Sequence, residues 1–111
     1  MDALVGYSLD RPAAGILARL IDWANASRRP ILSLDIPSGI DADSGVTRGT
    51  SVRPTVTLTL ALPKTGLSHA RVGLLYLGDI GIPASIYARI GITYENPFRE
   101  SFIVPLNRHR R

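Results

Sequence analysis

Two side chains suited to acid–base or ligand chemistry follow directly after predicted strands. Asp35 comes after the short apolar run 31–34, and Pro37 stops that strand because proline cannot donate a hydrogen bond to a sheet. Lys64 follows the run 55–62, whose alternating residues form the clearest strand pattern in the sequence. Ligands of open α/β sheets bind at the carboxyl ends of strands, so both positions are candidates for a site.

Each of these candidates also has a simpler interpretation. The position of Asp35 indicates a general acid–base group or a residue that binds a ligand. The alternative is a loop aspartate that caps nearby backbone N–H groups. The position of Lys64 indicates a contact to a phosphate or carboxylate group of a ligand. The alternative is a loop lysine that only water surrounds. The segment 41–45 is similar to the start of a calcium loop. Its glycine is at the fifth position and no distal glutamate follows, so it predicts a turn.

The elements around these residues predict an α/β fold. Further strands are expected at 2–6, 71–77 and 101–104, and helical turns at 84–90. A strand, a helix and a second strand with short links form a βαβ unit, whose two strands should be parallel. We therefore expect a mostly parallel sheet of about four or five strands with flanking helices, and 31–34 as its central, buried strand.

The main helix is predicted over residues 12–26. Asp10 is expected to cap it, with Pro12 in its first turn. The apolar side chains of Ile16, Leu20 and Trp23 recur at helical spacing. Leu17, Ile21 and Ala24 fill the neighbouring row, so the two rows together predict one wide apolar face. If Leu20 is fully buried, the change Leu20→Ala should destabilise the protein by roughly 2–5 kcal/mol.

Length and composition predict a single domain with a basic end. The chain has 111 residues, and we place the domain at 1–105 and a flexible tail at 106–111. Arg108, Arg110 and Arg111 contribute three charges to the net charge of +4, but no aromatic residues alternate with them, so no nucleic-acid partner is expected. No membrane-length apolar run occurs, so no membrane partner is expected, and the lack of cysteine fits a cytoplasmic protein.

Four segments occur in an order that is specific to one family. They are Asp2-Ala-Leu-Val-Gly-Tyr-Ser-Leu-Asp-Arg-Pro12, Asp35-Ile-Pro-Ser-Gly-Ile-Asp41, Leu62-Pro-Lys-Thr-Gly66 and Asp79-Ile-Gly-Ile-Pro83. The ordered set resembles the NAD(P)H-hydrate epimerase family, also called the YjeF N-terminal domain. The resemblance implies a Rossmann-like fold and the interconversion of the R and S forms of hydrated NADH or NADPH, a damaged nucleotide cofactor. It also implies a functional link to the dehydratase that restores this cofactor.

The resemblance also implies roles for individual residues. Asp2 and Ser38 match ligands of a bound potassium ion. Asp35 matches the acid that binds the substrate, and it is the catalytic candidate. Lys64 matches a family Pro-Lys-x-Gly segment and is expected to contact the substrate. A further substrate-contacting loop is implied at Gly6, Tyr7, Ser8, Leu9, Asp10, Arg11 and Pro12.

The sequence departs from the family pattern upstream of Asp2. The family has a phosphate-binding loop rich in asparagine and glycine before this strand, and this chain contains no Asn-Asn-Gly-Gly. The resemblance is therefore to the C-terminal half of such a domain, truncated at its N-terminus, and we expect little or no activity from the chain alone. The alternative is an inactive fragment or a non-catalytic module that binds a nucleotide or a protein. Uncovered apolar surface and an open sheet edge would then favour a homo-oligomer.

Overall fold

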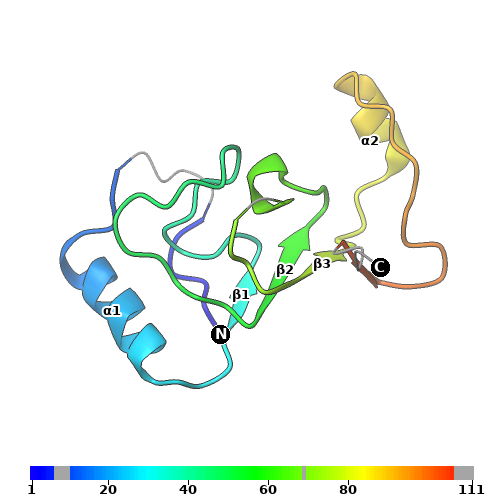
Figure 1. The fold of residues 1–111 in the computed structure, drawn as a ribbon. Helices are drawn as coiled ribbons and strands as arrows, with labels where there is room; N and C mark the ends of the chain where they lie inside the picture. The colour runs from blue at the N-terminus through cyan, green and yellow to red at the C-terminus, as the bar shows by residue number, and fades with distance from the viewer. Residues whose placement is uncertain (7–10, 69, 107–111) are drawn as a thin grey trace.

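One open, four-stranded sheet organises the chain (Figure 1). A computed structural model describes residues 1–6, 11–68 and 70–106. The first three strands of the sheet order β1-β2-β3-β4 are parallel, and β4 runs antiparallel to β3. The expected mostly parallel α/β sheet with flanking helices is therefore confirmed. The elements in chain order are α1 (Gly15–Ala26), β1 (Leu32–Leu34), β2 (Val56–Leu60), the 3-10 helix η1 (Thr65–Ser68), β3 (Leu74–Gly78), α2 (Ala84–Arg89) and β4 (Ile103–Pro105).

Strand β1 lies at an edge of this sheet, so the expectation of a central, buried strand is wrong. The segment 2–6 on its outer side makes one parallel bridge, between Asp2 and Ser33, and does not form the expected strand. Beyond this bridge, two backbone N–H groups of the segment donate to side chains and not to the backbone of β1. The N–H of Leu4 donates to Asp2 Oδ1, and the N–H of Val5 donates to Ser38 Oγ. The expected parallel direction is confirmed at this bridge.

The register gives the sheet two unlike faces. Residues in register point their side chains to the same side, and neighbours along a strand alternate between sides. One side, which we call the buried face, carries Ser33, Thr57, Thr59, Leu75 and Leu77, none of them more than 7% exposed. The other side, which we call the open face, carries Leu32, Leu34, Val56, Leu58, Leu60, Leu74, Tyr76 and Ile103, all exposed or half-buried.

The hydrophobic core lies against the buried face and is built largely from loops. Its cluster consists of Ile36, Ile40, Ala42, Leu67, Val72 and Leu75. The hydroxyl of Thr57 donates to the backbone oxygen of Val72 at 2.7 Å, so the polar atom that β2 places in this interior has a partner. The loop after β1 is therefore a structural layer of the domain as well as a candidate site.

Helix α1 fully buries only one residue of its predicted wide apolar face. Ile16 is 76% exposed, Leu20 41% and Trp23 73%, while Ile21 on the neighbouring row is fully buried. The prediction that Leu20 is a core residue is therefore wrong. The helix begins at Gly15, so Pro12 lies before its first turn, and the predicted cap Asp10 falls outside the described residues.

Polar contacts attach α1 to the loop before β2. Asn25 donates to the backbone oxygen of Ser51 at 2.9 Å and accepts from the Arg53 N–H at 2.9 Å. The hydroxyl of Thr50 donates to Asp22 at 2.7 Å. These three contacts hold the helix beside that loop (Figure 1), and Leu20 and Trp23 line a hollow that Leu4, Ile31 and Val52 share.

The chain after β3 leaves the sheet and returns as its last strand. Helix α2 stands apart from the sheet in Figure 1, and Tyr87 stacks on Tyr94 beside it at 4.3 Å between ring centroids. Strand β4 ends at Pro105, which pairs with Tyr76 at the outer edge, and Leu106 then donates its N–H to the oxygen of Leu75. Residues 107–111 of the predicted tail lie outside the described residues. In the described part of the chain, no helix combines the length and apolar character needed to cross a membrane.

Candidate functional site

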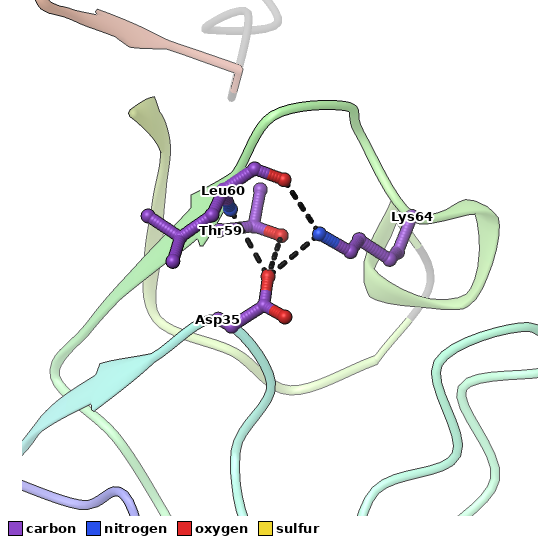
Figure 2. Close-up of polar contacts among 4 residues, drawn as sticks. All are labelled: Asp35, Thr59, Leu60 and Lys64. Atoms are coloured by element: carbon purple, nitrogen blue, oxygen red, sulfur yellow. Dashed lines mark hydrogen bonds and ion pairs between the residues drawn. The ribbon is translucent and has the colours of Figure 1, made fainter. Parts of the chain in front are cut away.

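A cluster of polar groups surrounds the Asp35 carboxylate, where β1 and β2 end (Figure 2). Its Oδ1 atom accepts three hydrogen bonds: from the Thr59 hydroxyl at 3.1 Å, the Leu60 N–H at 3.0 Å and the Lys64 ammonium at 2.6 Å. The Asp35 N–H also donates to the oxygen of Leu58 at 2.7 Å. The end of β2 and the loop after it therefore fix the side chain that follows β1, as the strand-end prediction required.

The backbone of Asp35 helps to aim this side chain. Its φ angle is +64°, in the left-handed region that most residues avoid and that aspartate and asparagine tolerate best after glycine. The chain turns sharply there, since β1 ends at Leu34 and Ile36 already belongs to the core. A residue of this type at this position thus serves both the turn and the cluster.

The two oxygen atoms of Asp35 differ in their surroundings. Within the described residues, no hydrogen bond reaches Oδ2, and Figure 2 shows it turned away from the three donors on Oδ1. Burial raises the pKa of Asp35, but the hydrogen bonds from Lys64, Leu60 and Thr59 and the positive charge of Lys64 outweigh it, so the pKa lies below its usual value. Near neutral pH the site therefore holds an ionised carboxylate with one oxygen available as an acceptor.

Lys64 is hydrogen-bonded within this cluster and is not a solvated loop residue. Its Nζ donates to Asp35 Oδ1 and, at 2.7 Å, to the backbone oxygen of Leu60, and its side chain is 16% exposed. An ammonium group has three N–H donors, so two are used here and one remains for a ligand. Lys64 is also the only lysine of the sequence, which otherwise uses arginine as its cation.

The two candidate cation ligands lie together in a second, buried cluster. Asp2 is 4% exposed and Ser38 1% exposed. The Ser38 hydroxyl donates to Asp2 Oδ1 at 2.7 Å, and the Ser38 N–H and the Ser33 hydroxyl donate to Asp2 Oδ2 at 3.0 and 2.6 Å. The carboxylate and the hydroxyl are hard oxygen donors that lie within hydrogen-bond distance of each other, the type of atom that a hard cation takes as a ligand. A cation would displace the Ser38 proton, which can rotate away because a hydroxyl is a free rotor.

The turn that carries Ser38 is locked from the opposite side. The oxygen of Ser38 accepts the Val52 N–H at 2.8 Å. Gly39 has a φ of +96°, and a Cβ atom built on it would lie 2.3 Å from the oxygen of Thr50, so only glycine fits. The segment 41–45 behind it is the predicted turn: Asp41 Oδ1 accepts the N–H groups of Asp43 and Ser44.

The structure assembles the predicted residues into two pairs, Asp35 with Lys64 and Asp2 with Ser38. Of the predicted loop, Gly6, Arg11 and Pro12 are described and exposed, while Tyr7, Ser8, Leu9 and Asp10 lie outside the described residues. Sequence reasoning missed Ser33, Thr59 and the Leu60 N–H. The signal for Thr59 was available, because it is the last threonine of the alternating run 55–62 and lies near the carboxyl end of that strand, where Asp35 was also expected.

An open, mostly parallel sheet with a carboxylate at a strand end places the chain among Rossmann-like α/β proteins. The family model described as YjeF-related protein N-terminus matches residues 1–66. Over 107 residues the chain is 52% identical to an NAD(P)H-hydrate epimerase of Dehalogenimonas lykanthroporepellens, covering 96% of this chain. The chain belongs to the YjeF N-terminal family.

A second relative and a solved structure support this placement. A bifunctional NAD(P)H-hydrate repair enzyme Nnr of Moorella thermoacetica is 37% identical over 92 residues, which is 79% of this chain and 17% of that protein. The crystal structure of the yeast protein YNL200c superposes with a TM-score of 0.70 at 28% identity and covers 92% of this chain. The chain spans 44% of the Dehalogenimonas relative and 44% of the yeast chain, so it matches less than half of their length.

Proposed function

We propose that this chain supplies the acid–base part of an NAD(P)H-hydrate epimerase site, with Asp35 as the catalytic residue. The observation that carries this proposal is the asymmetric carboxylate, with Oδ1 held by three donors and Oδ2 open within the described residues. The printed name of the Dehalogenimonas relative supports the reaction class. The bifunctional relative supports a link to a dehydratase that acts on the same damaged cofactor.

The chemistry needs a base that can return its proton. Asp35 Oδ2 accepts the proton of the ring hydroxyl while the adjacent carbon–nitrogen bond opens. The electron pair of that bond passes to the ring nitrogen, which takes up the proton that Asp35 has accepted, and the carbon becomes a planar carbonyl. Attack by the nitrogen on the other face reverses both proton transfers and gives the other epimer. Because its pKa lies below the usual value, Asp35 is ionised near neutral pH and enters this sequence as a base.

Other residues of the chain would bind the substrate and a cation. Lys64 holds the carboxylate in place, and we assign its third N–H donor to the substrate. The loop from Gly6 to Pro12 is assigned to substrate contact as well. Asp2 and Ser38 are assigned to potassium, which when bound would place a positive charge beside the turn that carries Asp35.

The test uses a chimaera, in which these 111 residues replace the aligned part of the Dehalogenimonas relative. The measurement is the rate at which the epimer rejected by the dehydratase disappears when both enzymes are present. Asp35→Asn should lower the turnover number by about 10²–10⁴-fold, the usual contribution of a positioned acid–base group. Asparagine is the cleanest replacement, because it keeps the shape of the side chain and tolerates the left-handed backbone.

The matched control is Asp22→Asn, on the exposed surface of α1. Asp22 also accepts a threonine hydroxyl, from Thr50, but it shares no hydrogen bond with the Asp35 cluster, so turnover should stay near that of the parent. If Asp35→Asn turns over like the parent, Asp35 is a capping group and the mechanism is wrong. The 111-residue chain alone is expected to turn over poorly, because binding energy from the rest of the nucleotide positions the reacting ring.

The cation assignment has its own test, which needs no turnover. An ion that binds the native state raises the melting temperature as its concentration rises. At matched ionic strength, potassium chloride should therefore give a higher melting temperature than sodium chloride, and Ser38→Ala should abolish that difference. Equal melting temperatures of the parent chain in the two salts would refute the assignment.

The second candidate is a non-catalytic interaction module of the same fold, which the uncovered open face favours. A chimaera that folds, binds the nucleotide and shows no epimerisation even with Asp35 intact would support this alternative over the enzyme.

A further inference from the structure

Two glycines bring the loop that carries Lys64 against the loop that follows Asp35. The N–H of Gly66 donates to the oxygen of Ala42 at 2.8 Å. A Cβ atom built on Gly66 would lie 2.3 Å from the nitrogen of Gly45, and one built on Gly45 would lie 2.4 Å from the oxygen of Gly66. The two backbones therefore meet with no side chain between them, and we call this the glycine contact.

Space, and not backbone conformation, requires glycine at residue 66. Its φ angle lies outside the left-handed region, and it belongs to the 3-10 helix η1, whose conformation is open to alanine. The three atoms nearest to a Cβ on Gly66 are backbone atoms of Asp41, Ala42 and Gly45, which cannot move aside as the end of a flexible side chain can. A methyl group at this position must therefore push the two loops apart.

The segments on both sides of the glycine contact are themselves fixed. Leu67, which follows Gly66, is 1% exposed and belongs to the core cluster together with Ala42. On the other side, Asp41 Oδ1 accepts the N–H and the hydroxyl of Ser44, both at 2.8 Å, and so holds the turn in which Gly45 lies. The separation of the two loops therefore has little freedom to vary.

The position of Lys64 depends on this separation. Its backbone oxygen accepts the Leu67 N–H at 3.2 Å, so η1 fixes the main chain from which its side chain starts. From there the ammonium reaches Asp35 Oδ1 at 2.6 Å (Figure 2). Such a hydrogen bond weakens once the two atoms are more than about 3.2 Å apart, so a shift of η1 that makes room for a methyl group should weaken it.

We propose that Gly66 is a positioning residue, which through its contact with Gly45 places the Lys64 ammonium on the Asp35 carboxylate. The other two donors to Asp35 Oδ1 belong to β2 itself, so only the contact from Lys64 should depend on Gly66. The inference rests on the proposed function for its catalytic meaning, but the contact itself can be measured without turnover.

The test follows the ¹⁵N signal of Lys64, the only lysine of the sequence. In the parent chain Asp35→Asn should shift this signal, because it removes a negative charge 2.6 Å from the ammonium nitrogen. In a chain that carries Gly66→Ala, the same change should shift the signal by about half as much or less, because the interaction of two charges falls with their separation. An undiminished shift would overturn the proposal, since Gly66 would then serve packing alone.

The matched control is Gly91→Ala, after α2. A Cβ atom there would meet nothing within 4 Å, but the φ of +78° makes the replacement strained. This variant therefore carries a cost in stability without moving η1, and Asp35→Asn should shift the Lys64 signal in it as much as in the parent. A reduced shift in Gly91→Ala as well would overturn the proposal, because any loss of stability would then disturb the pair.

A second variant applies if Gly66→Ala does not fold. Asp41→Ala loosens the turn that holds Gly45 from its exposed side, and Asp41 shares no hydrogen bond with Asp35 or Lys64 in the described part of the chain. The effect of Asp35→Asn on the Lys64 signal should be reduced there too, and an undiminished effect would equally overturn the proposal.

Turnover of the chimaera separates this inference from the proposed function. Gly66→Ala should lower turnover by about tenfold or more, because small misplacements of a catalytic group are costly, while Gly91→Ala should not. A reduced effect on the Lys64 signal with turnover unchanged would support the positioning role of Gly66 and contradict the part that the proposed function assigns to Lys64.

Discussion

At the scale of single residues, the contact between Asp35 and Lys64 can be followed by NMR without overlap from other lysine signals. Lys64 is the only lysine, so labelling with ¹⁵N-lysine gives one ammonium signal for the whole chain. Lys64 Nζ lies 2.6 Å from Asp35 Oδ1, so its chemical shift should follow the titration of that carboxyl. The midpoint should fall below the usual aspartate value of about 3.9, and Asp35→Asn should abolish the titration. A midpoint above the usual value would contradict the cluster.

The same pair predicts a pH dependence of stability. Asp35 has a lowered pKa in the folded state, so its contribution is fully present above the usual aspartate pKa and is lost as the pH falls through the lowered value. Lys64→Met should therefore reduce the melting temperature most near neutral pH, and the difference from the parent should shrink in acid. Arg89→Met, an exposed change on α2, should show no such trend. A difference that grows in acid would reverse the sign and refute this reasoning.

At the scale of elements, the apolar face of α1 has one fully buried side chain, and it lies on the row beside Ile16, Leu20 and Trp23. Ile21 is fully buried and Leu20 is 41% exposed. Ile21→Ala should lower the free energy of unfolding by about 2–5 kcal/mol, while Leu20→Ala should lower it by less than about 1 kcal/mol. Chemical denaturation of the two variants measures both values. The reverse order would mean that α1 packs through the outer row after all.

The bridge between the N-terminal segment and β1 should depend on the Asp2 carboxylate. Asp2→Ala leaves the buried hydroxyls of Ser33 and Ser38 without their acceptor, and each unsatisfied group costs about 1–3 kcal/mol. Glu100→Ala removes an exposed carboxylate and should change stability by less than about 0.5 kcal/mol. Thermal melts of the two variants compare them. Equal melting temperatures would show that Asp2 does not hold the segment.

The sequence predicted the positions of the helices and strands better than it predicted which elements pack against one another. The strands at β1, β2, β3 and β4 and both helices were predicted, because alternation and helical spacing are local signals. The pairing of Asp35 with Lys64 was within reach, since both follow strands that end at one edge. The edge position of β1 and the exposure of Trp23 were not, because they depend on which segments cover a surface rather than on the segments themselves.

At the scale of the whole molecule, the open face should govern how the chain behaves in solution. Leu74 is 51% exposed on that face, so Leu74→Glu should raise the concentration at which the chain self-associates while leaving stability within about 0.5 kcal/mol. Ile90→Glu is the matched control, because Ile90 follows α2, is 67% exposed and does not lie on the open face. It should raise the concentration of self-association by less. Light scattering against concentration decides between them. Equal improvement by both variants would assign the association to α2.

Pro105 sets the form that such association takes. Phe102 and Leu106 hydrogen-bond inward to β3, so the alternate residues Ile103 and Pro105 direct their backbone groups outward, where Pro105 has no N–H to offer. The outer edge of β4 is therefore a poor template for another strand, and a fibril that grows by adding strands cannot start there. Pro105→Val restores an N–H at this edge and should therefore increase the pairing of β4 with strands of other molecules, which thioflavin binding of the parent and the variant would measure.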